Sequence, residues 1–150
     1  MYAAPVIPGD ALVPARRPLV LDTNIVLDLF VFQDPVTAAL RQLITDRAMD
    51  WIATTAMREE LARVLDYPQI ARRLQQQAST PAQVLQRFDA QTRVVGASPK
   101  AGVTCKDADD QKFIDLAVAH QALLLSKDQA VLCMAKRLAA LGIQARATLA

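Results

Sequence analysis

The feature that constrains the fold most is the regular alternation of short apolar runs with longer segments of helical periodicity. The strand candidates are residues 19–21, 51–55, 93–96, 122–126 and, at the end of the chain, 143–149. Strands that alternate with helices predict a parallel sheet, covered by helices on both faces and joined by right-handed crossovers. A chain of 150 residues suffices for one such α/β domain with a packed core.

The segments between these runs carry helical signals. Helices are expected over residues 24–32, 35–50, 56–67, 108–121 and 128–142, and as two helices within 69–91. Thr80 followed by Pro81 is typical of a helix start, because threonine caps the helix and proline fits its first turn. We expect Pro68 to end the helix before it, and Gly142 to end the last one.

Composition narrows the class of protein. Hydrophobic residues make up 53% of the chain, which excludes a disordered chain, and no apolar run approaches the roughly 20 residues of a membrane-spanning helix. Residues 1–17 contain three prolines and lack the apolar core of a secretory signal, so they are expected to form a disordered lead-in to a domain at 18–150. No membrane association and a cytoplasmic location are expected.

The net charge of +2 is too small for nucleic acid to be bound by overall attraction, so phosphate contacts must come from local basic residues. Five arginines lie in the central helices, and ordinary solvated helix faces account for them: Arg58, Arg63, Arg72, Arg73 and Arg87.

Cysteine and histidine usage argues against a zinc site. Cys105 and Cys133 lack the close spacing of a thiol metal site, and His120 is the only histidine. The two thiols are expected to be structural, as in a reducing compartment.

Two aspartates directly follow strand candidates. Asp22 comes after residues 19–21, and Asp128 follows Ser126 at the end of the fourth strand candidate. Because ligands bind at the carboxyl ends of parallel strands, both are candidate site residues, together with the neighbouring Asn24 and Ser126. Helix capping is the alternative explanation for either aspartate.

Two further carboxylates lie on predicted helices. Glu60 borders the apolar face of its helix, whereas Glu59 points about 100° away and is expected to be solvated. Asp110 projects toward the apolar row of its helix, while Asp107 is better explained as a cap and Asp109 is a weaker supporting candidate.

Carboxylates that meet at one edge of a sheet raise each other's pKa unless a cation neutralises them. Ligation by oxygen alone favours Mg²⁺ or Mn²⁺, and such a site suits phosphodiester hydrolysis. A haloacid dehalogenase type of phosphatase is disfavoured, because it needs an aspartate at the position of Asn24.

Three segments together resemble the PIN domain family. They are LVLDTNIVLDLF, REELARVL with its following Tyr67-Pro68, and DADDQKFIDLAVAHQALLLSKDQAVL. The resemblance is strongest to toxin components of type II toxin–antitoxin pairs. It implies a Rossmann-like, three-layer α/β/α sandwich with a central parallel sheet and a metal-dependent ribonuclease site.

By this resemblance, Asp22, Glu60, Asp110 and Asp128 form the acidic quartet that binds metal, and Asn24 and Ser126 support it. One position departs from the pattern, because Lys127 stands where a small residue is expected. Two roles stay open for its ammonium group beside Asp128, which are to weaken metal binding or to contact a substrate phosphate.

The resulting hypothesis is a metal-dependent endoribonuclease that cuts single-stranded or structured RNA. The resemblance also implies a small antitoxin as a protein partner and assembly into a homo-oligomer. The alternative is a catalytically weak or inactive PIN-like module that binds RNA or protein through its acidic edge.

Overall fold

The computed structural model describes residues 16–149, and a parallel sheet lies at its centre. Its strand order is β3-β2-β1-β4-β5, and each neighbouring pair is parallel. The strands are β1 (Arg17–Leu21), β2 (Met49–Ala53), β3 (Arg93–Val94), β4 (Leu123–Leu125) and β5 (Ala145–Arg146). All five strand candidates are therefore confirmed. The lead-in predicted for residues 1–17 falls outside the described residues up to position 15, and β1 begins at Arg17.

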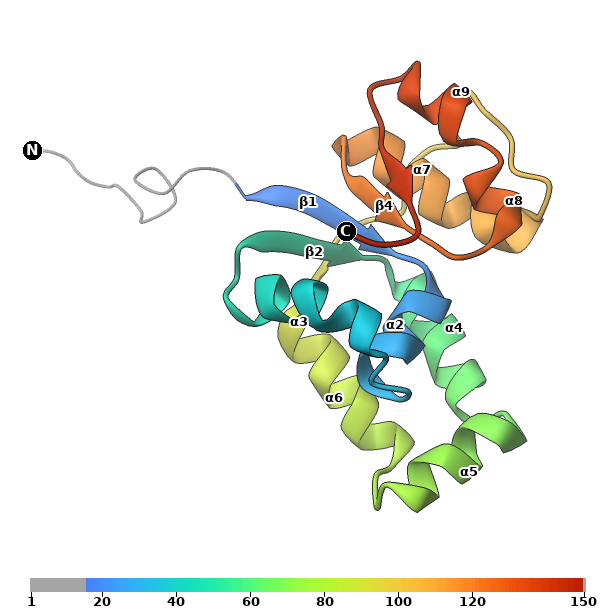
Figure 1. Cartoon of the computed structure of the whole chain (residues 1–150). Helices are drawn as coiled ribbons and strands as arrows, with labels where there is room; N and C mark the ends of the chain where they lie inside the picture. The colour runs from blue at the N-terminus through green and yellow to red at the C-terminus, as the bar shows by residue number, and fades with distance from the viewer. Residues whose placement is uncertain (1–15, 150) are drawn as a thin grey trace, which may run out of the picture.

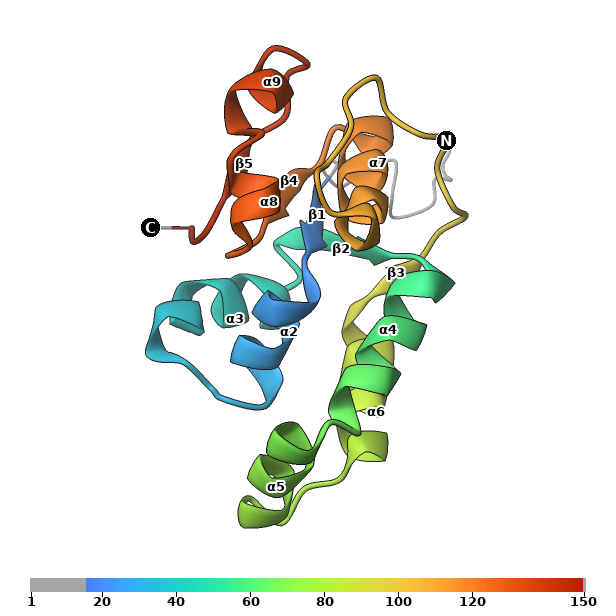
Figure 2. The same cartoon turned by 90° about the vertical axis from the view of Figure 1, so that its right-hand side faces the viewer.

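Helices cover the sheet on both sides and give the three-layer α/β/α sandwich that was predicted. Figure 1 shows α7, α8 and α9 above the strands, with α2, α3, α4 and α6 below them, and Figure 2 shows the same arrangement turned by 90°. The helices and 3-10 turns are α2 (Thr23–Phe30), η1 (Pro35–Thr37), α3 (Ala38–Thr45), α4 (Thr55–Leu65), α5 (Pro68–Gln76), α6 (Pro81–Gln91), η2 (Ala108–Asp110), α7 (Gln111–His120), α8 (Gln129–Leu132) and α9 (Ala135–Ala139).

The core is built on the three inner strands, β2, β1 and β4. Leu19, Val20 and Leu124 are fully buried, as expected for strands covered on both faces. Trp51 of β2 packs edge-on against Phe88 of α6, with ring centroids 5.3 Å apart, and so fixes that helix to the sheet. No helix within residues 16–149 is long and apolar enough to cross a lipid bilayer.

The helix boundary predicted at Pro68 differs from the structure. Pro68 does not end α4, which stops at Leu65; it is instead the first residue of α5, where its missing N–H is not needed. Thr80 caps α6 as predicted, through a reciprocal pair of hydrogen bonds with Gln83. Gly142 has a φ of 81°, the left-handed conformation that glycine adopts most readily after a helix.

The helix expected over residues 128–142 is broken into α8 and α9. The carbonyl of Ala130 would accept the N–H of Met134 in a continuous helix, but it lies within hydrogen-bond distance of the thiols of Cys105 and Cys133, at 3.3 and 3.4 Å. The N–H of Met134 donates to Val131 instead, which tightens the turn and ends α8.

Candidate active site

Asp22 lies where β1 meets α2, and its side chain is directed by a serine rather than by the helix. The backbone carbonyl of Asp22 accepts the first N–H bonds of α2, while its carboxylate interacts only weakly with the helix start, through the backbone of Asn24. Ser126, which is buried at the end of β4, donates its hydroxyl proton to Asp22 Oδ2 over 2.6 Å. The same hydroxyl oxygen accepts the N–H of Asp128, so Ser126 positions both aspartates.

Asp128 caps α8 and also faces Asp22. Its Oδ1 accepts the N–H of Ala130 over 2.8 Å, so the capping role considered from the sequence is real. Only one carboxylate oxygen is used in this bond, which leaves the other for a second partner. Capping and a place in the site are therefore compatible for this residue.

Asp110 lies at the junction of η2 and α7, on a different element from Asp22 and Asp128. It is buried, and its Oδ2 has no hydrogen-bond partner among residues 16–149. Asp107, as predicted, is the cap of this segment and accepts the N–H of Asp109. A buried carboxylate oxygen without a partner is costly and calls for a cation or a proton.

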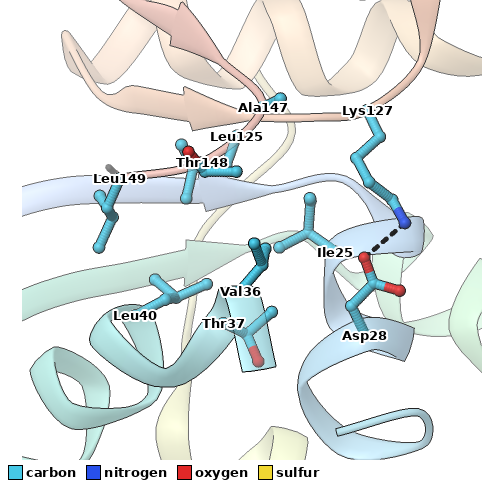
Figure 3. A pocket seen from close by; sticks show the side chains of 10 residues that line it. All are labelled: Ile25, Asp28, Val36, Thr37, Leu40, Leu125, Lys127, Ala147, Thr148 and Leu149. Carbon is cyan, nitrogen blue, oxygen red and sulfur yellow. Dashed lines mark ion pairs between the residues drawn. The ribbon is translucent and has the colours of Figure 1, made fainter. Parts of the chain in front are cut away.

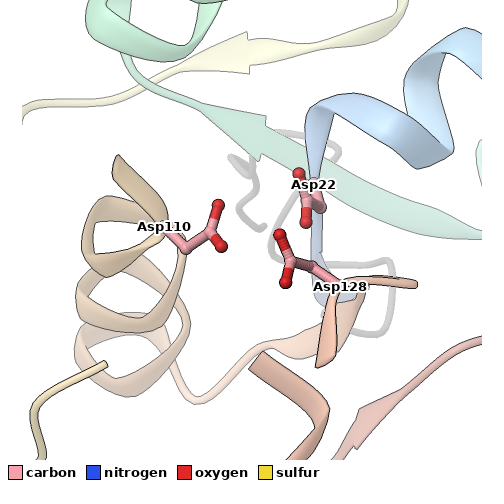
Figure 4. Close-up of side chains that lie close together, drawn as sticks. All are labelled: Asp22, Asp110 and Asp128. Atoms are coloured by element: carbon pink, nitrogen blue, oxygen red, sulfur yellow. The ribbon is translucent and has the colours of Figure 1, made fainter. Parts of the chain in front are cut away.

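The carboxylates of Asp22, Asp110 and Asp128 converge, with one oxygen of each lying within 4.8 Å of the others (Figure 4). We call these three residues the aspartate cluster. Burial raises the pKa of Asp110 to about 7, helped by its hydrogen bond with Asp128 and by the charges of Asp22 and Asp128. Burial also raises the pKa of Asp22, and the hydrogen bond from Ser126 offsets part of this rise.

The donor set of the cluster fits a divalent cation. All its ligand atoms are carboxylate oxygens, which suit Mg²⁺ or Mn²⁺ better than zinc. The partnerless Oδ2 of Asp110 is the observation that most directly indicates a missing positive charge.

Glu60 lies outside this cluster. From α4 its carboxylate accepts the hydroxyl proton of Thr23 and pairs with the ammonium group of Lys112, each over 2.5 Å. It is close enough for its charge to contribute to the raised pKa of Asp22. The structure therefore brings three of the four predicted ligands together and holds the fourth beside them through Thr23 and Lys112.

A family model described as the PIN domain matches residues 18–130. The chain belongs to the PIN domain family. The resemblance inferred from the three sequence segments is thereby confirmed.

A solved structure shares the fold of this PIN domain. It is VapBC2 from Rickettsia felis bound to a DNA fragment from their promoter. The TM-score is 0.58 at 14% sequence identity, and the match covers 85% of this chain and 98% of that one. At this identity the likeness concerns the fold alone. No curated protein matches the chain in sequence.

Lys127, the position that departs from the PIN pattern, has a partner that neither open role had named. Its Nζ lies 2.6 Å from Oδ2 of Asp28, a buried residue of α2 (Figure 3). The pair borders a small pocket that also contacts α3 and the C-terminal segment. Lys127 therefore joins the loop that carries Asp128 to the helix that follows Asp22.

The supporting candidates are more peripheral than Ser126. Asn24 has an exposed side chain on the first turn of α2, and Asp109 is exposed beside Glu60. Thr23, Asp28 and Lys112 were missed from the sequence, although an aspartate inside the apolar stretch IVLDLFVF was a signal for Asp28.

Proposed function

We propose that this PIN domain is a metal-dependent endoribonuclease that hydrolyses RNA phosphodiester bonds. The observation that carries the proposal is the aspartate cluster at the carboxyl ends of β1 and β4, with a buried oxygen of Asp110 left without a partner. A Mg²⁺ or Mn²⁺ ion bound there would polarise the phosphate and activate water.

In this proposal, Asp22, Asp110 and Asp128 hold the ion, and Glu60 is the fourth acidic residue of the site. Ser126 keeps the carboxylate of Asp22 turned toward the cluster. Asn24 and Asp109 are assigned supporting places at the mouth of the site, where their exposed side chains face solvent and substrate. The substrate is single-stranded or structured RNA.

The test is cleavage of labelled RNA by purified protein with Mg²⁺ or Mn²⁺. Asp22→Asn removes one charge of the cluster while retaining the shape of the side chain, and should abolish cleavage. Asp66→Asn changes an exposed aspartate at the end of α4 and should leave it intact. Cleavage that survives Asp22→Asn unchanged would place the reaction elsewhere.

The biological role that we propose is the toxin of a type II toxin–antitoxin pair, acting in the cytoplasm. The segments that resemble such toxins and the fold shared with VapBC2 support this role. Two free thiols, Cys105 and Cys133, are compatible with a reducing compartment. Expression of the chain alone should arrest growth, and co-expression of a small neighbouring reading frame should restore it.

One observation favours the alternative of a weakly active or inactive module that binds RNA or protein. Glu60 is already neutralised by Lys112, which leaves three aspartates as free ligands. Calorimetry with Mn²⁺ separates the two functions, because a nuclease must bind the ion whereas a binding module need not.

We also propose that the domain forms homo-oligomers. Exposed apolar side chains are available for such contacts, namely Phe32, Val36, Val94 and Leu141. Light scattering of the purified protein would show the oligomeric state directly.

A further inference from the structure

A polar hollow of about 330 Å³ opens beside the aspartate cluster. We call it the side groove, and its lining residues are Glu60, Arg63, Val64, Tyr67, Asp109 and Lys112. Two lining residues place the side groove next to the aspartate cluster. Asp109 directly precedes Asp110, and the charge of Glu60 contributes to the raised pKa of Asp22. The volume of the side groove is that of a pocket for a small organic ligand, so the groove can take one nucleotide.

One wall of the groove is a continuous helical stripe. Glu60, Arg63, Val64 and Tyr67 are spaced by three, four and seven residues, which places them on the same face of α4 and its C-terminal turn. The stripe therefore leads from the acidic site outward to an aromatic side chain.

Tyr67 lines this groove, and in the described part of the chain its structural role falls to its backbone. Its backbone carbonyl accepts the N–H groups of Ile70 and Ala71 and so starts α5. The side chain is 50% exposed and makes no hydrogen bond within the described part of the chain. An exposed aromatic ring that the fold does not use is available as a stacking surface.

The two cations of the groove differ in their availability. Lys112 is held by the carboxylate of Glu60 and by the backbone carbonyl of Asp109. Arg63 is exposed and has no ion pair or hydrogen bond to any residue between 16 and 149. Arg63 is therefore the cation that is free to meet a phosphate.

We propose that the side groove receives an unpaired nucleotide next to the cleaved bond, with its base stacked on Tyr67 and its phosphate bound by Arg63. This inference rests on the proposed nuclease function and narrows its substrate to RNA that is single-stranded beside the cut. A base in a duplex is stacked on both faces by its neighbours, so it cannot use Tyr67. Stacking on an aromatic side chain, together with a phosphate contact, is how proteins grip single strands without reading their sequence.

Binding of a short labelled RNA of mixed sequence, in the presence of EDTA, tests the proposal without cleavage. Fluorescence anisotropy is measured for the single strand and for the same strand paired with its complement. Tyr67→Leu should weaken binding of the single strand by about fivefold to a hundredfold, whereas Tyr67→Phe should stay within about twofold of the parent. Duplex binding should change by no more than about twofold with either variant.

Arg63→Gln should weaken binding of the single strand and lower the slope of log affinity against log salt by about 0.7, the value for one lost phosphate contact. Arg72→Gln, which changes an exposed arginine of α5 outside the groove, should leave the slope unchanged. Thermal unfolding of each variant verifies that the fold is retained.

The proposal is overturned if Tyr67→Leu binds the single strand as tightly as the parent does, or loses duplex binding to the same extent. The result can be separated from a failure of the nuclease function, because binding is measured without metal. A parent protein that does not cut RNA with Mn²⁺ but binds it through Tyr67 would refute the nuclease and retain the groove. A parent that cuts RNA equally well without Tyr67 would retain the nuclease function and refute the role of the side groove.

Discussion

Asp110→Asn should stabilise the metal-free protein at alkaline pH, because it removes the carboxylate that the cluster is least able to ionise. The asparagine has nearly the same shape, and its amide can donate to Asp128 as the protonated carboxyl does. The variant thus imitates Asp110 in its neutral form at every pH. The free energy of unfolding should rise, although a buried polar residue has been changed.

The size of the effect follows from the geometry and the pKa. Two ionised carboxylates 4.8 Å apart repel by about 3 kcal/mol at an effective dielectric constant of 20. The pKa of Asp110 rises from 3.8 to about 7, which corresponds to at most about 4 kcal/mol lost when the folded protein is deprotonated. Side-chain relaxation and entry of water reduce this cost, so we expect a gain of about 2 kcal/mol for the variant.

The sign of the pH dependence is set by the direction of the shift. A carboxyl group whose pKa is raised in the folded state favours folding while it is protonated. This contribution is complete below pH 3.8 and is lost as the pH rises through about 7. The difference between variant and parent should therefore be clearly smaller near pH 4.5, where it has only begun to appear, than at pH 8, where it is fully developed.

Urea unfolding followed by the fluorescence of Trp51, the only tryptophan, measures both stabilities in the presence of EDTA. Asp66→Asn serves as a control for a lost surface charge. Adding Mn²⁺ should stabilise the parent and should stabilise the variant much less, because the variant lacks one metal ligand. Equal differences at pH 4.5 and pH 8, or a less stable variant at pH 8, would refute the reasoning.

Two further predictions concern the ion pairs around the cluster. Lys112→Met keeps the aliphatic stem but frees Glu60 of its ammonium partner, so calorimetry should show Mn²⁺ bound several-fold more tightly; a weaker affinity would mean that Lys112 is needed to place Glu60. Lys127→Met leaves Asp28 buried without its cation and should lower the free energy of unfolding in urea by about 1–2 kcal/mol. The loss is limited to this range because the ammonium group of Lys127 is 46% exposed and therefore partly screened by water. Asp28→Asn in the same background should recover part of that loss, and no recovery would show that the pair itself contributes little.

The strands and most helices could be predicted because their signals are local. The run at residues 19–21 is apolar and ends at Asp22, and Thr80-Pro81 carries its own capping signal, so each is visible in a few consecutive residues. The break between α8 and α9 was not predicted, and one contact beside it, from the thiol of Cys105 to the carbonyl of Ala130, joins residues 25 positions apart and so has no local signal. The same limit applies to the order of the strands, which is decided by contacts between distant segments.

The candidate site divides in the same way. Asp22 and Asp128 could be predicted as site residues because each follows a strand, and the two strands, β1 and β4, are neighbours in the sheet. Asp110 could be predicted because it projects toward the apolar face of its helix. The ion pair between Glu60 and Lys112 joins residues 52 positions apart in the sequence, so no local pattern predicts that these two side chains pair. The PIN resemblance named Glu60 as an acidic residue of the site but said nothing of its partner.

The charges around the cluster explain why the fold tolerates so many carboxylates without metal. Lys112 balances Glu60, the hydroxyl of Ser126 supports Asp22, and the backbone N–H of Ala130 supports Asp128. Oδ2 of Asp110 has no hydrogen-bond partner among residues 16–149, and because the pKa of Asp110 is raised to about 7, a proton neutralises this carboxyl in about half of the molecules near pH 7. A dication in the cluster must therefore displace that proton, so we infer that metal affinity increases with pH through the range in which Asp110 ionises.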